Sequence, residues 1–399
     1  MYQPPDTVLR KLADLLINFA LGSGKGVKPR DVIQLTVPDV AKPLYIHLLQ
    51  SVLKAGAFPK VTLLPTGTEK LFFDLANDEQ LTFFPAAFKK AEADLIDHHV
   101  SIIAEVNPKE LSFVDPRKLF RTMDARRQMR EWLNAKEQQG KFTWTLALWG
   151  TEAMAKEAGM TLKQYWHEII VGCYLDAANP VQEWQRIQKE QGRLKRVLDA
   201  MKIRSVHVES ERIDLTVGIG SNRKWLGGGG RNIPSFEIFV SPDWRMTEGT
   251  IAFNQPLYRY GNILKEVSLE FRKGKVIRAT ARKGQKVLDA MLERKNADKI
   301  GEFSLTDRRF SRITKFMANT LFDENIGGRF GNTHIALGRA YRDSFIGDMS
   351  QPTEVEWETM GYNESPEHTD IISTEDRTVT ATMEDGKTKI IFKDGQFTV

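Results

Sequence analysis

The stretch DVIQLTV at residues 31–37 is a short run of β-forming residues that ends at Pro38. Valine, isoleucine and threonine pack well on a pleated surface, and proline ends such a run because it has no N–H to donate. The run therefore predicts a β-strand. Ahead of it, residues 11–21 carry apolar side chains at helical spacing, which predicts an amphipathic helix.

Strand-like and helix-like runs continue to alternate after this strand. Helical patterns cover 45–53, 69–94 and 115–136. Strand-like runs lie between and after them, at 60–64, 100–106 and 142–149. Such alternation is typical of a parallel sheet covered on both faces. We therefore expect an α/β domain with a parallel sheet over residues 1–178.

The character of the sequence changes after Asn179-Pro180, where a long helix with an apolar stripe begins. We interpret 179–204 as a helix that connects two domains. Short β-rich runs follow it, at 213–217, 237–240, 267–271, 276–281, 379–383 and 389–392. The last two flank Asp385-Gly386, a hairpin signal. We expect 205–399 to form an α+β domain with a mixed or antiparallel sheet.

Composition limits the class of protein. The 399 residues are 41% hydrophobic and 27% charged, with a net charge of only +5, and the basic residues are interspersed with acidic ones. We therefore expect no nucleic-acid partner. No stretch approaches the roughly 20 apolar residues that span a bilayer, so we expect no membrane partner. The single cysteine, Cys173, forms no internal disulfide, and no signal-peptide pattern opens the chain, which predicts a cytoplasmic location.

Several familiar motifs fail on inspection. The run Gly22–Gly26 resembles a phosphate loop, but its lysine is followed by glycine and the run follows a helix, so a glycine turn at a helix end is expected. The run Gly227–Gly230 lacks dinucleotide-binding spacing and is either a mobile loop near the active site or a structural turn. No serine-nucleophile elbow and no H-E-x-x-H motif occur.

Carboxylates and histidines in unusual settings are concentrated in the C-terminal half. His368 and Asp370 are separated by one residue, so in an extended segment both side chains project from one face. Glu237 and Glu302 both interrupt apolar, β-like runs, and a buried carboxylate is costly unless it is paired or bound to a metal. These residues predict a metal site.

Two further residues extend this constellation. His334 follows a glycine-rich loop, and Glu324 lies in the polar stretch Asp323-Glu324-Asn325. Oxygen and imidazole ligands without thiolates suit zinc, cobalt or manganese, and also magnesium. Spacing alone does not choose among these ions.

The sequence resembles the aminopeptidase S/T family, the thermophilic-type dinuclear metalloaminopeptidases. The matching stretches are NIPSFEIFVSPD around Glu237, IGEFSL around Glu302, TLFDEN around Glu324, THIALGRAY from His334 to Tyr341, and HTD from His368 to Asp370. They occur in order between residues 232 and 370. The N-terminal alternating half is compatible with the same family.

The resemblance implies a centre of two divalent metal ions. Its ligands would be Glu237, Glu302, Glu324, His334, His368 and Asp370. Glu302 would bridge the ions and is our candidate proton shuttle, and Tyr341 matches the family's catalytic tyrosine, which would hydrogen-bond the oxyanion. A metal-activated water would then hydrolyse the first peptide bond of substrates with a free N-terminus. The resemblance also implies a homodimer.

Two other functions are compatible with the residues alone. The same metals would support an amidohydrolase that acts on non-peptide amides. Alternatively, the clustered carboxylates would stabilise a non-catalytic binding protein, although closed structural sites rarely need so many of them. Substrates with free and blocked N-termini distinguish the aminopeptidase from the amidohydrolase.

Overall fold

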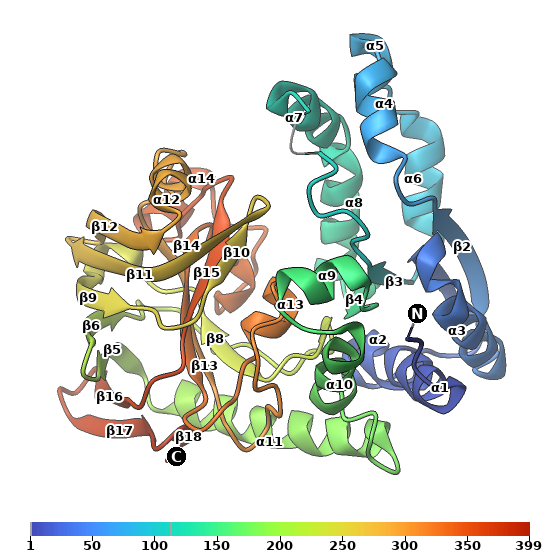
Figure 1. Cartoon of the computed structure of the whole chain (residues 1–399). Coiled ribbons are helices and arrows are strands. Elements are labelled where there is room, and N and C mark those ends of the chain that lie inside the picture. Colours follow the sequence, from blue (N-terminus) through green and yellow to red (C-terminus); the bar gives the residue numbers. More distant parts are fainter. Residues whose placement is uncertain (1, 112–113) are drawn as a thin grey trace. The chain divides into compact units, whose positions relative to one another are not determined.

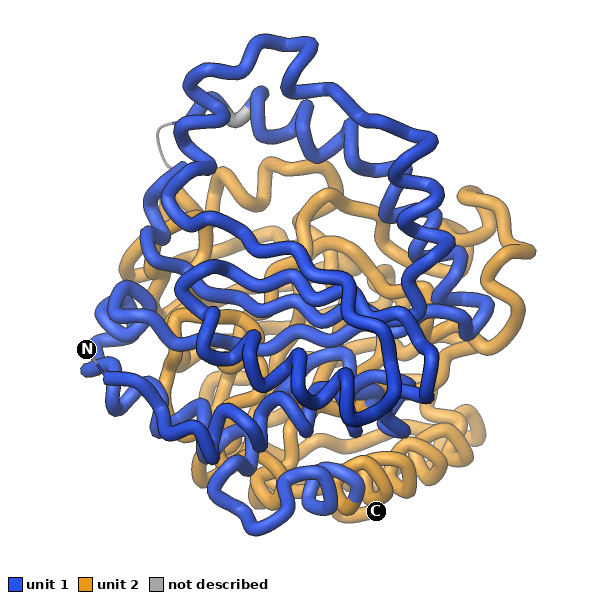
Figure 2. The backbone as a smooth tube through the Cα atoms, turned by 90° about the vertical axis from the view of Figure 1, so that its right-hand side faces the viewer, with its two compact units in different colours: residues 1–185, 229–234 blue, residues 186–228, 235–399 orange. Residues whose placement is uncertain are grey.

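The computed structural model describes residues 2–111 and 114–399, which form two compact units. Unit 1 comprises 1–185 and 229–234, and unit 2 comprises 186–228 and 235–399 (Figure 2). The long helix α11 (Pro180–Ala200) begins in unit 1 and ends in unit 2. Among the described residues, none of the helices combines the length and apolar character required to cross a membrane.

Unit 1 is built on the parallel sheet that the alternating pattern predicts. Its five strands lie in the order β2-β1-β3-β4-β7, and every pairing is parallel. Figure 1 labels β2, β3 and β4 of this sheet. The strands are β1 (Val32–Pro38), β2 (Phe58–Leu64), β3 (His98–Ile103), β4 (Thr143–Leu148) and β7 (Asn232–Ile233). β7 comes from the short segment of unit 1 that follows residue 228.

The two faces of this sheet differ in polarity. Residues that alternate along β1 and β3, among them Leu35, Val37 and Val100, are fully buried and form the apolar core. The opposite face carries Gln34, Thr36 and, from β3, His99. Helix α3 (Lys42–Lys54) packs against β1 and β2 and also against α1.

The remaining helices of unit 1 precede or connect these strands. They are α1 (Asp6–Leu15), the π-helix η1 (Leu16–Ala20), α2 (Leu21–Gly24), the 3-10 turn η2 (Asp39–Ala41), α4 (Glu69–Leu75), α5 (Asp78–Thr82), α6 (Ala86–Leu95), α7 (Pro116–Ala125), α8 (Arg127–Gln138), α9 (Glu152–Glu157) and α10 (Leu162–Gly172). The helix expected over 115–136 is broken at Arg126 into α7 and α8, and the Asp115 side chain caps α7 by accepting a hydrogen bond from the N–H of Arg117.

The glycine turn predicted after the first helix is confirmed. Gly22, Gly24 and Gly26 all have positive φ, which L side chains rarely adopt. At Gly26 an added Cβ would lie 2.6 Å from the carbonyl oxygen of Asn18, so the close approach of the chain to the preceding helix requires glycine.

Unit 2 contains two antiparallel sheets. In the larger, of nine strands, the order is β10-β11-β9-β6-β5-β16-β17-β18, with β12 paired to β11 (Figure 1). The strands are β5 (Ile203–Glu209), β6 (Ile213–Gly218), β9 (Glu248–Ala252), β10 (Leu257–Arg259), β11 (Asn262–Arg272), β12 (Lys275–Lys283), β16 (Thr378–Met383), β17 (Thr388–Lys393) and β18 (Gln396–Phe397). The predicted hairpin at Asp385-Gly386 joins β16 to β17.

The smaller sheet of four strands has the order β15-β14-β13-β8. These strands are β8 (Glu237–Val240), β13 (Ile300–Thr306), β14 (Asn332–Gly338) and β15 (His368–Ser373). Short helices α12 (Gln285–Leu292), α13 (Thr320–Asp323) and α14 (Glu354–Thr359) and the 3-10 turns η3 (Trp244–Met246) and η4 (Arg342–Ser344) complete the unit. The expectation of an α/β unit followed by an α+β unit is thus confirmed.

Candidate metal centre

Register places the predicted ligands on one face of the four-stranded sheet. Side chains of paired residues in antiparallel strands share a face, and residues two apart along a strand do too. The predicted ligands in this sheet therefore share one face: Glu237, Glu302, His334, His368 and Asp370. The pairs that establish this are Thr306–Glu237, Ser304–His334 and Ala336–Asp370. The other face carries Ile238, Phe303, Leu305, Ile335 and Ile371, all fully buried. An apolar core thus supports a polar face.

Three of the predicted ligands form a tight group. One ligand atom each from Glu237, Glu302 and His334 lies within 4.8 Å of the other two. His334 Nε2 is 3.1 Å from Glu302 Oε1 and 3.2 Å from Glu237 Oε2. The spacing suits three side chains that share one ion.

His368 and Asp370 lie beside this group and contact each other. His368 Nε2 is 3.5 Å from Asp370 Oδ1 and 3.9 Å from Glu302 Oε2. Extended geometry in β15 places both side chains on one face, as the one-residue spacing predicts. Glu302 therefore turns one carboxylate oxygen toward His334 and the other toward His368.

Glu324 reaches the site from outside the sheet. It follows α13, is buried, and accepts a hydrogen bond from Asn325 Nδ2 at 3.3 Å. The Asn325 Oδ1 in turn accepts the backbone N–H of Phe236, next to Glu237, at 2.6 Å. Asn325 thereby ties the segment of Glu324 to the start of β8.

Tyr341 lies beside His368, which contacts Asp370. Its ring centroid is 4.7 Å from that of His368, and the residue as a whole is 41% exposed. His368 is itself oriented by its other ring nitrogen, because Nδ1 hydrogen-bonds the carbonyl oxygen of Arg339 at 2.8 Å. A proton on Nδ1 leaves Nε2 free to act as a ligand.

Burial and mutual repulsion shift the pKa values of the carboxylates. Burial, with the charges of Glu237 and Asp370, raises the pKa of Glu302 to about 7 against the opposing hydrogen bond from His334. Burial and the same two carboxylates raise the pKa of Glu324 well above its usual value. Burial also raises the pKa of Asp370, but His368 outweighs it and leaves that pKa lowered.

The negative charge of these carboxylates also shifts the pKa values of His334, His368 and Tyr341. Burial lowers the pKa of His334, but hydrogen bonds to Glu237 and Glu302 outweigh it and raise the pKa well above the usual value. The pKa of His368 is raised to about 9, because Asp370 and Glu302 outweigh burial. Desolvation and the nearby carboxylates raise the pKa of the Tyr341 hydroxyl, which therefore stays protonated at neutral pH.

The donor set fits a divalent metal. Glu237, Glu302 and Asp370 are less than a tenth exposed, and within the described residues the cationic groups at ion-pair distance from them are imidazoles. Buried carboxylates need a compensating positive charge, and imidazole supplies it only while protonated. Carboxylate oxygens and imidazole nitrogens are together the ligand set of zinc, manganese and cobalt sites.

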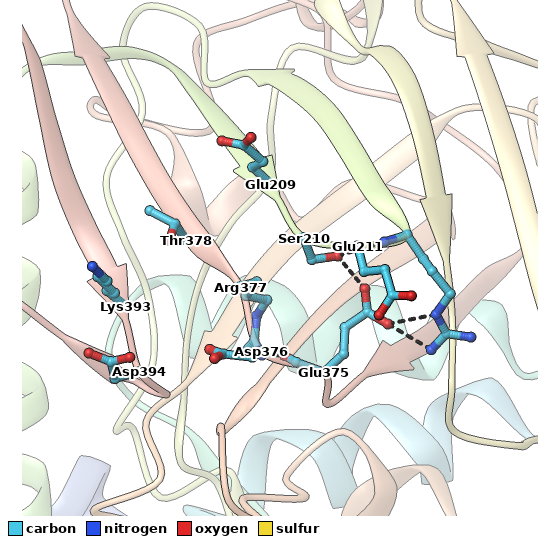
Figure 3. A pocket seen from close by; sticks show the side chains of 10 residues that line it. Glu209, Ser210, Glu211, Glu375, Asp376, Arg377, Thr378, Lys393 and Asp394 are labelled. Atoms are coloured by element: carbon cyan, nitrogen blue, oxygen red, sulfur yellow. Dashed lines mark hydrogen bonds and ion pairs between the residues drawn. The ribbon is translucent and has the colours of Figure 1, made fainter.

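A second polar hollow in unit 2 does not share these properties. Figure 3 shows it between the ends of β5, β6, β16 and β17. There Glu375 accepts hydrogen bonds from Ser210 and from Arg212, whose Nη2 lies 2.6 Å from Oε2. Most charged side chains that line the hollow are exposed, so hydration or a neighbouring charge satisfies them.

The fold and the site together define a metalloprotein whose acid-rich centre lies on one face of an antiparallel sheet. The family model described as thermophilic metalloprotease (M29) matches residues 6–397, and the chain belongs to that family. Aminopeptidase PepS of Streptococcus thermophilus and aminopeptidase T of Thermus thermophilus are each 27% identical to this chain, over 98% of both chains in each case.

The fold has a solved counterpart. The structure titled wild-type AmpT from Thermus thermophilus aligns with a TM-score of 0.83 at 24% identity, covering 98% of this chain and 99% of that one. This likeness supports the architecture of an α/β unit and antiparallel sheets described above.

Some polar residues of the site were not singled out from the sequence. Asn325, Ser241 and the carbonyl of Arg339 hold the segments that carry the predicted ligands and Tyr341. Asn325 and Ser241 stand inside the stretches that carry the family resemblance, but their partners lie about 90 to 100 residues away along the chain. The glycine run approaches the site through Gly227, where an added Cβ would lie 2.2 Å from the carbonyl oxygen of Glu237.

Proposed function

We propose that this chain removes N-terminal residues from peptides at a centre of two divalent metal ions. Membership of the M29 family and its aminopeptidase relatives make the chain a metal-dependent aminopeptidase. The proposal adds the number of ions and the residues that hold them. The ligands are Glu237, Glu302, Glu324, His334, His368 and Asp370.

The position of Glu302 carries the proposal of two ions. Its Oε1 lies 3.1 Å from His334, which also contacts Glu237, while its Oε2 lies 3.9 Å from His368, which also contacts Asp370. One carboxylate thus separates two ligand sets, each with its own imidazole and its own second carboxylate. Glu324 completes the negative charge around them.

Bound divalent ions polarise a peptide carbonyl and lower the pKa of water from about 15.7 toward about 7. The protein itself contributes a neutral donor. Tyr341 keeps its proton because its pKa is raised, and its hydroxyl donates a hydrogen bond to the oxyanion of the tetrahedral intermediate. Loss of one such donor typically costs about 100- to 1,000-fold in rate.

Glu302 is our candidate to carry the proton to the departing amine. It is buried among the ligands, so a proton on it is shielded from exchange with bulk water. A neutral α-amine would be a ligand for a bound metal ion, whereas an acylated N-terminus offers no such lone pair, so the centre would favour a substrate with a free N-terminus.

The test measures release of nitroaniline from leucine-p-nitroanilide by protein stripped with a chelator and then resupplied with cobalt, zinc, manganese or magnesium. We expect activity to vanish on stripping, to return with metal, and to be absent on the N-acetylated substrate. Titration of the stripped protein should reach two ions per chain. Saturation at one ion contradicts the dinuclear centre. Cleavage of the blocked substrate contradicts the requirement for a free N-terminus.

We also propose that the protein is a homodimer, which the family resemblance implies. In unit 1, six large apolar side chains on adjoining segments are between 42% and 75% exposed: Leu71, Phe72, Leu75, Phe83, Phe120 and Met123. At about 150–250 Å² for a large side chain, they leave roughly 600 Å² of apolar surface. A standard interface buries about 800 Å² per partner, so an exposed apolar area of this size is large enough to form most of the interface with a second copy.

Sedimentation of the wild type and of a Leu75→Asp, Phe83→Asp variant tests this interface. We expect a dimer that the double variant converts to a monomer. A wild type that sediments as a monomer at micromolar concentration contradicts the proposal. The cytoplasmic location also remains a proposal, supported by the single cysteine, Cys173, which is buried and forms no disulfide.

A further inference from the structure

Three consecutive backbone amides fix the segment that carries Tyr341. The N–H of Arg339 donates to the carbonyl oxygen of Glu367 at 2.7 Å, and that of Ala340 to the carbonyl oxygen of Asn363 at 2.8 Å. The N–H of Tyr341 donates to Ser241 Oγ, also at 2.7 Å. The first two acceptors are backbone groups. The third is a side chain, so a single substitution removes it.

Ser241 is itself held firmly. It follows β8 directly and is fully buried. Its carbonyl oxygen accepts a hydrogen bond from Arg223 Nε at 2.8 Å, and Arg223 also donates to the carbonyl oxygens of Ser221 and Met360. The serine hydroxyl is therefore a fixed point at the end of the strand that carries Glu237.

Two ring contacts locate the side chain of Tyr341. The ring centroid lies 4.7 Å from that of His368 and 6.5 Å from that of Phe239. Both neighbours project from the face of the sheet that carries the ligands. These contacts limit tilt of the ring, but its height above the face depends on the Cα position, which the backbone hydrogen bonds set.

We propose that Ser241 is a positioning residue for Tyr341: its Oγ holds the tyrosine N–H so that the phenol hydroxyl meets the developing oxyanion. The inference rests on the role proposed for Tyr341. Without the acceptor, the segment shifts, and a misplacement of about 1 Å can cost on the order of 100-fold in rate.

A double-mutant cycle tests this inference. Ser241→Ala is made in the wild type and in a Tyr341→Phe background, and kcat, KM and bound metal are measured for all four proteins. In the wild type we expect kcat to fall about 10- to 100-fold, with KM, bound metal and the absorption spectrum of the cobalt-loaded protein unchanged. In the Tyr341→Phe background we expect no further fall, because the hydroxyl that Ser241 positions is already absent.

Two more variants keep the test decisive. Ser51→Ala in unit 1 removes another buried serine hydroxyl, which donates to Asp14 Oδ1 at 2.5 Å, and should leave kcat unchanged. Should Ser241→Ala not fold, Ser241→Cys retains a weak acceptor of similar shape and should give a smaller fall in kcat.

Each outcome separates the inference from the function on which it rests. An equal fall in kcat in both backgrounds, or no fall in either, overturns the positioning role of Ser241. A Tyr341→Phe enzyme with unchanged kcat overturns the proposed role of Tyr341 and with it the inference. Loss of bound metal in Ser241→Ala shows a role in folding the centre and likewise overturns the inference.

Discussion

Two sheets of this protein each present a polar face above an apolar core, and the two faces handle charge differently. On the parallel sheet of unit 1, Lys60 Nζ donates to Gln34 Oε1 at 2.7 Å and to Glu92 Oε1 at 2.5 Å. Lys89 contacts the other oxygen of Glu92 at 2.7 Å. Lysines of the same unit thus neutralise the Glu92 carboxylate, and we call this polar face of the parallel sheet the balanced face.

On the four-stranded sheet of unit 2, carboxylates are concentrated on the polar face, which we call the unbalanced face. Glu237, Glu302 and Asp370 face imidazoles where Glu92 faces ammonium groups. Imidazole is a cation only when protonated, and a metal ligand only when it is not. A polar sheet face is thus a structural feature when its charges balance, and a candidate metal centre when they do not.

The largest expected effect follows from removing a carboxylate from the unbalanced face. Glu302→Gln keeps the shape of the side chain but loses a charge between the two ligand sets. We expect metal affinity to fall by more than the roughly 10- to 100-fold that loss of an outer-shell partner costs, with activity lost in parallel. Metal content after dialysis and calorimetric titration measure this.

The matched control makes the same change on the balanced face. Glu92→Gln should retain full metal content and activity, because Glu92 is paired with lysines of unit 1. In the metal-free state we also expect Glu302→Gln to unfold at a higher temperature than the wild type at pH 8, where burial of the ionised carboxylate is costly. Full metal retention by Glu302→Gln contradicts our assignment.

A smaller effect is expected at Asn325, which hydrogen-bonds the proposed ligand Glu324 without being a proposed ligand itself. Asn325→Ala removes the donor to Glu324 Oε1 and the acceptor for the N–H of Phe236. We expect metal affinity to weaken about 10- to 100-fold. Competition with a chromogenic chelator measures it, with Asn77→Ala in unit 1 as a control for loss of an asparagine. Unchanged affinity means that Glu324 is held by other contacts.

We predict that His99, on the balanced face, makes the stability of the protein depend on pH. Burial, helped by the charge of Lys60, lowers the pKa of His99 from 6.5 to about 4. Between these values the unfolded chain binds a proton that the folded protein excludes, so the free energy of unfolding falls as pH drops from about 6.5 to about 4. Thermal unfolding of wild type and His99→Gln across this range checks it. Identical pH profiles contradict the prediction, and His207→Asn controls for loss of an exposed histidine.

The smallest effect is expected at Lys60, whose side chain is 31% exposed. Lys60→Gln leaves Glu92 with Lys89, so the loss of stability should be about 1 kcal/mol or less, with metal content and kcat unchanged. Lys70→Gln, at an exposed helical pair with Asp74, gives the reference for a surface ion pair. Urea unfolding of both variants measures the difference. A change in metal content would mean that the two faces are not independent.

The local sequence pattern was sufficient to predict the parallel sheet of unit 1 and the buried acidic site of unit 2. Alternating strands and helices predicted the parallel sheet, and glutamates that interrupt apolar runs predicted a buried acidic site. The one-residue spacing of His368 and Asp370 correctly placed both on one face. Each of these features depends on residues that are neighbours in sequence, where period and burial are directly visible.

Features that depend on distant pairing were not predictable. The register that aligns Thr306 with Glu237 and Ser304 with His334 joins strands separated by tens of residues. No local signal marks Ser241 or Asn325 as partners of Tyr341 and Phe236. The two residues of β7 are too few to show a period, so their return to the first sheet was not anticipated.

That return has a consequence for synthesis of the chain. β7 joins β4 through Leu146–Asn232 and Ala147–Ile233, so the first sheet lacks its last strand until residue 233 has been made. Helix α11 and the hairpin of β5 and β6 are translated in the meantime. N-terminal units generally fold first as a chain emerges from the ribosome. Here the last strand of the first sheet is synthesised only four residues before Glu237, so the sequence needed to complete the first unit becomes available just before the first proposed metal ligand is made.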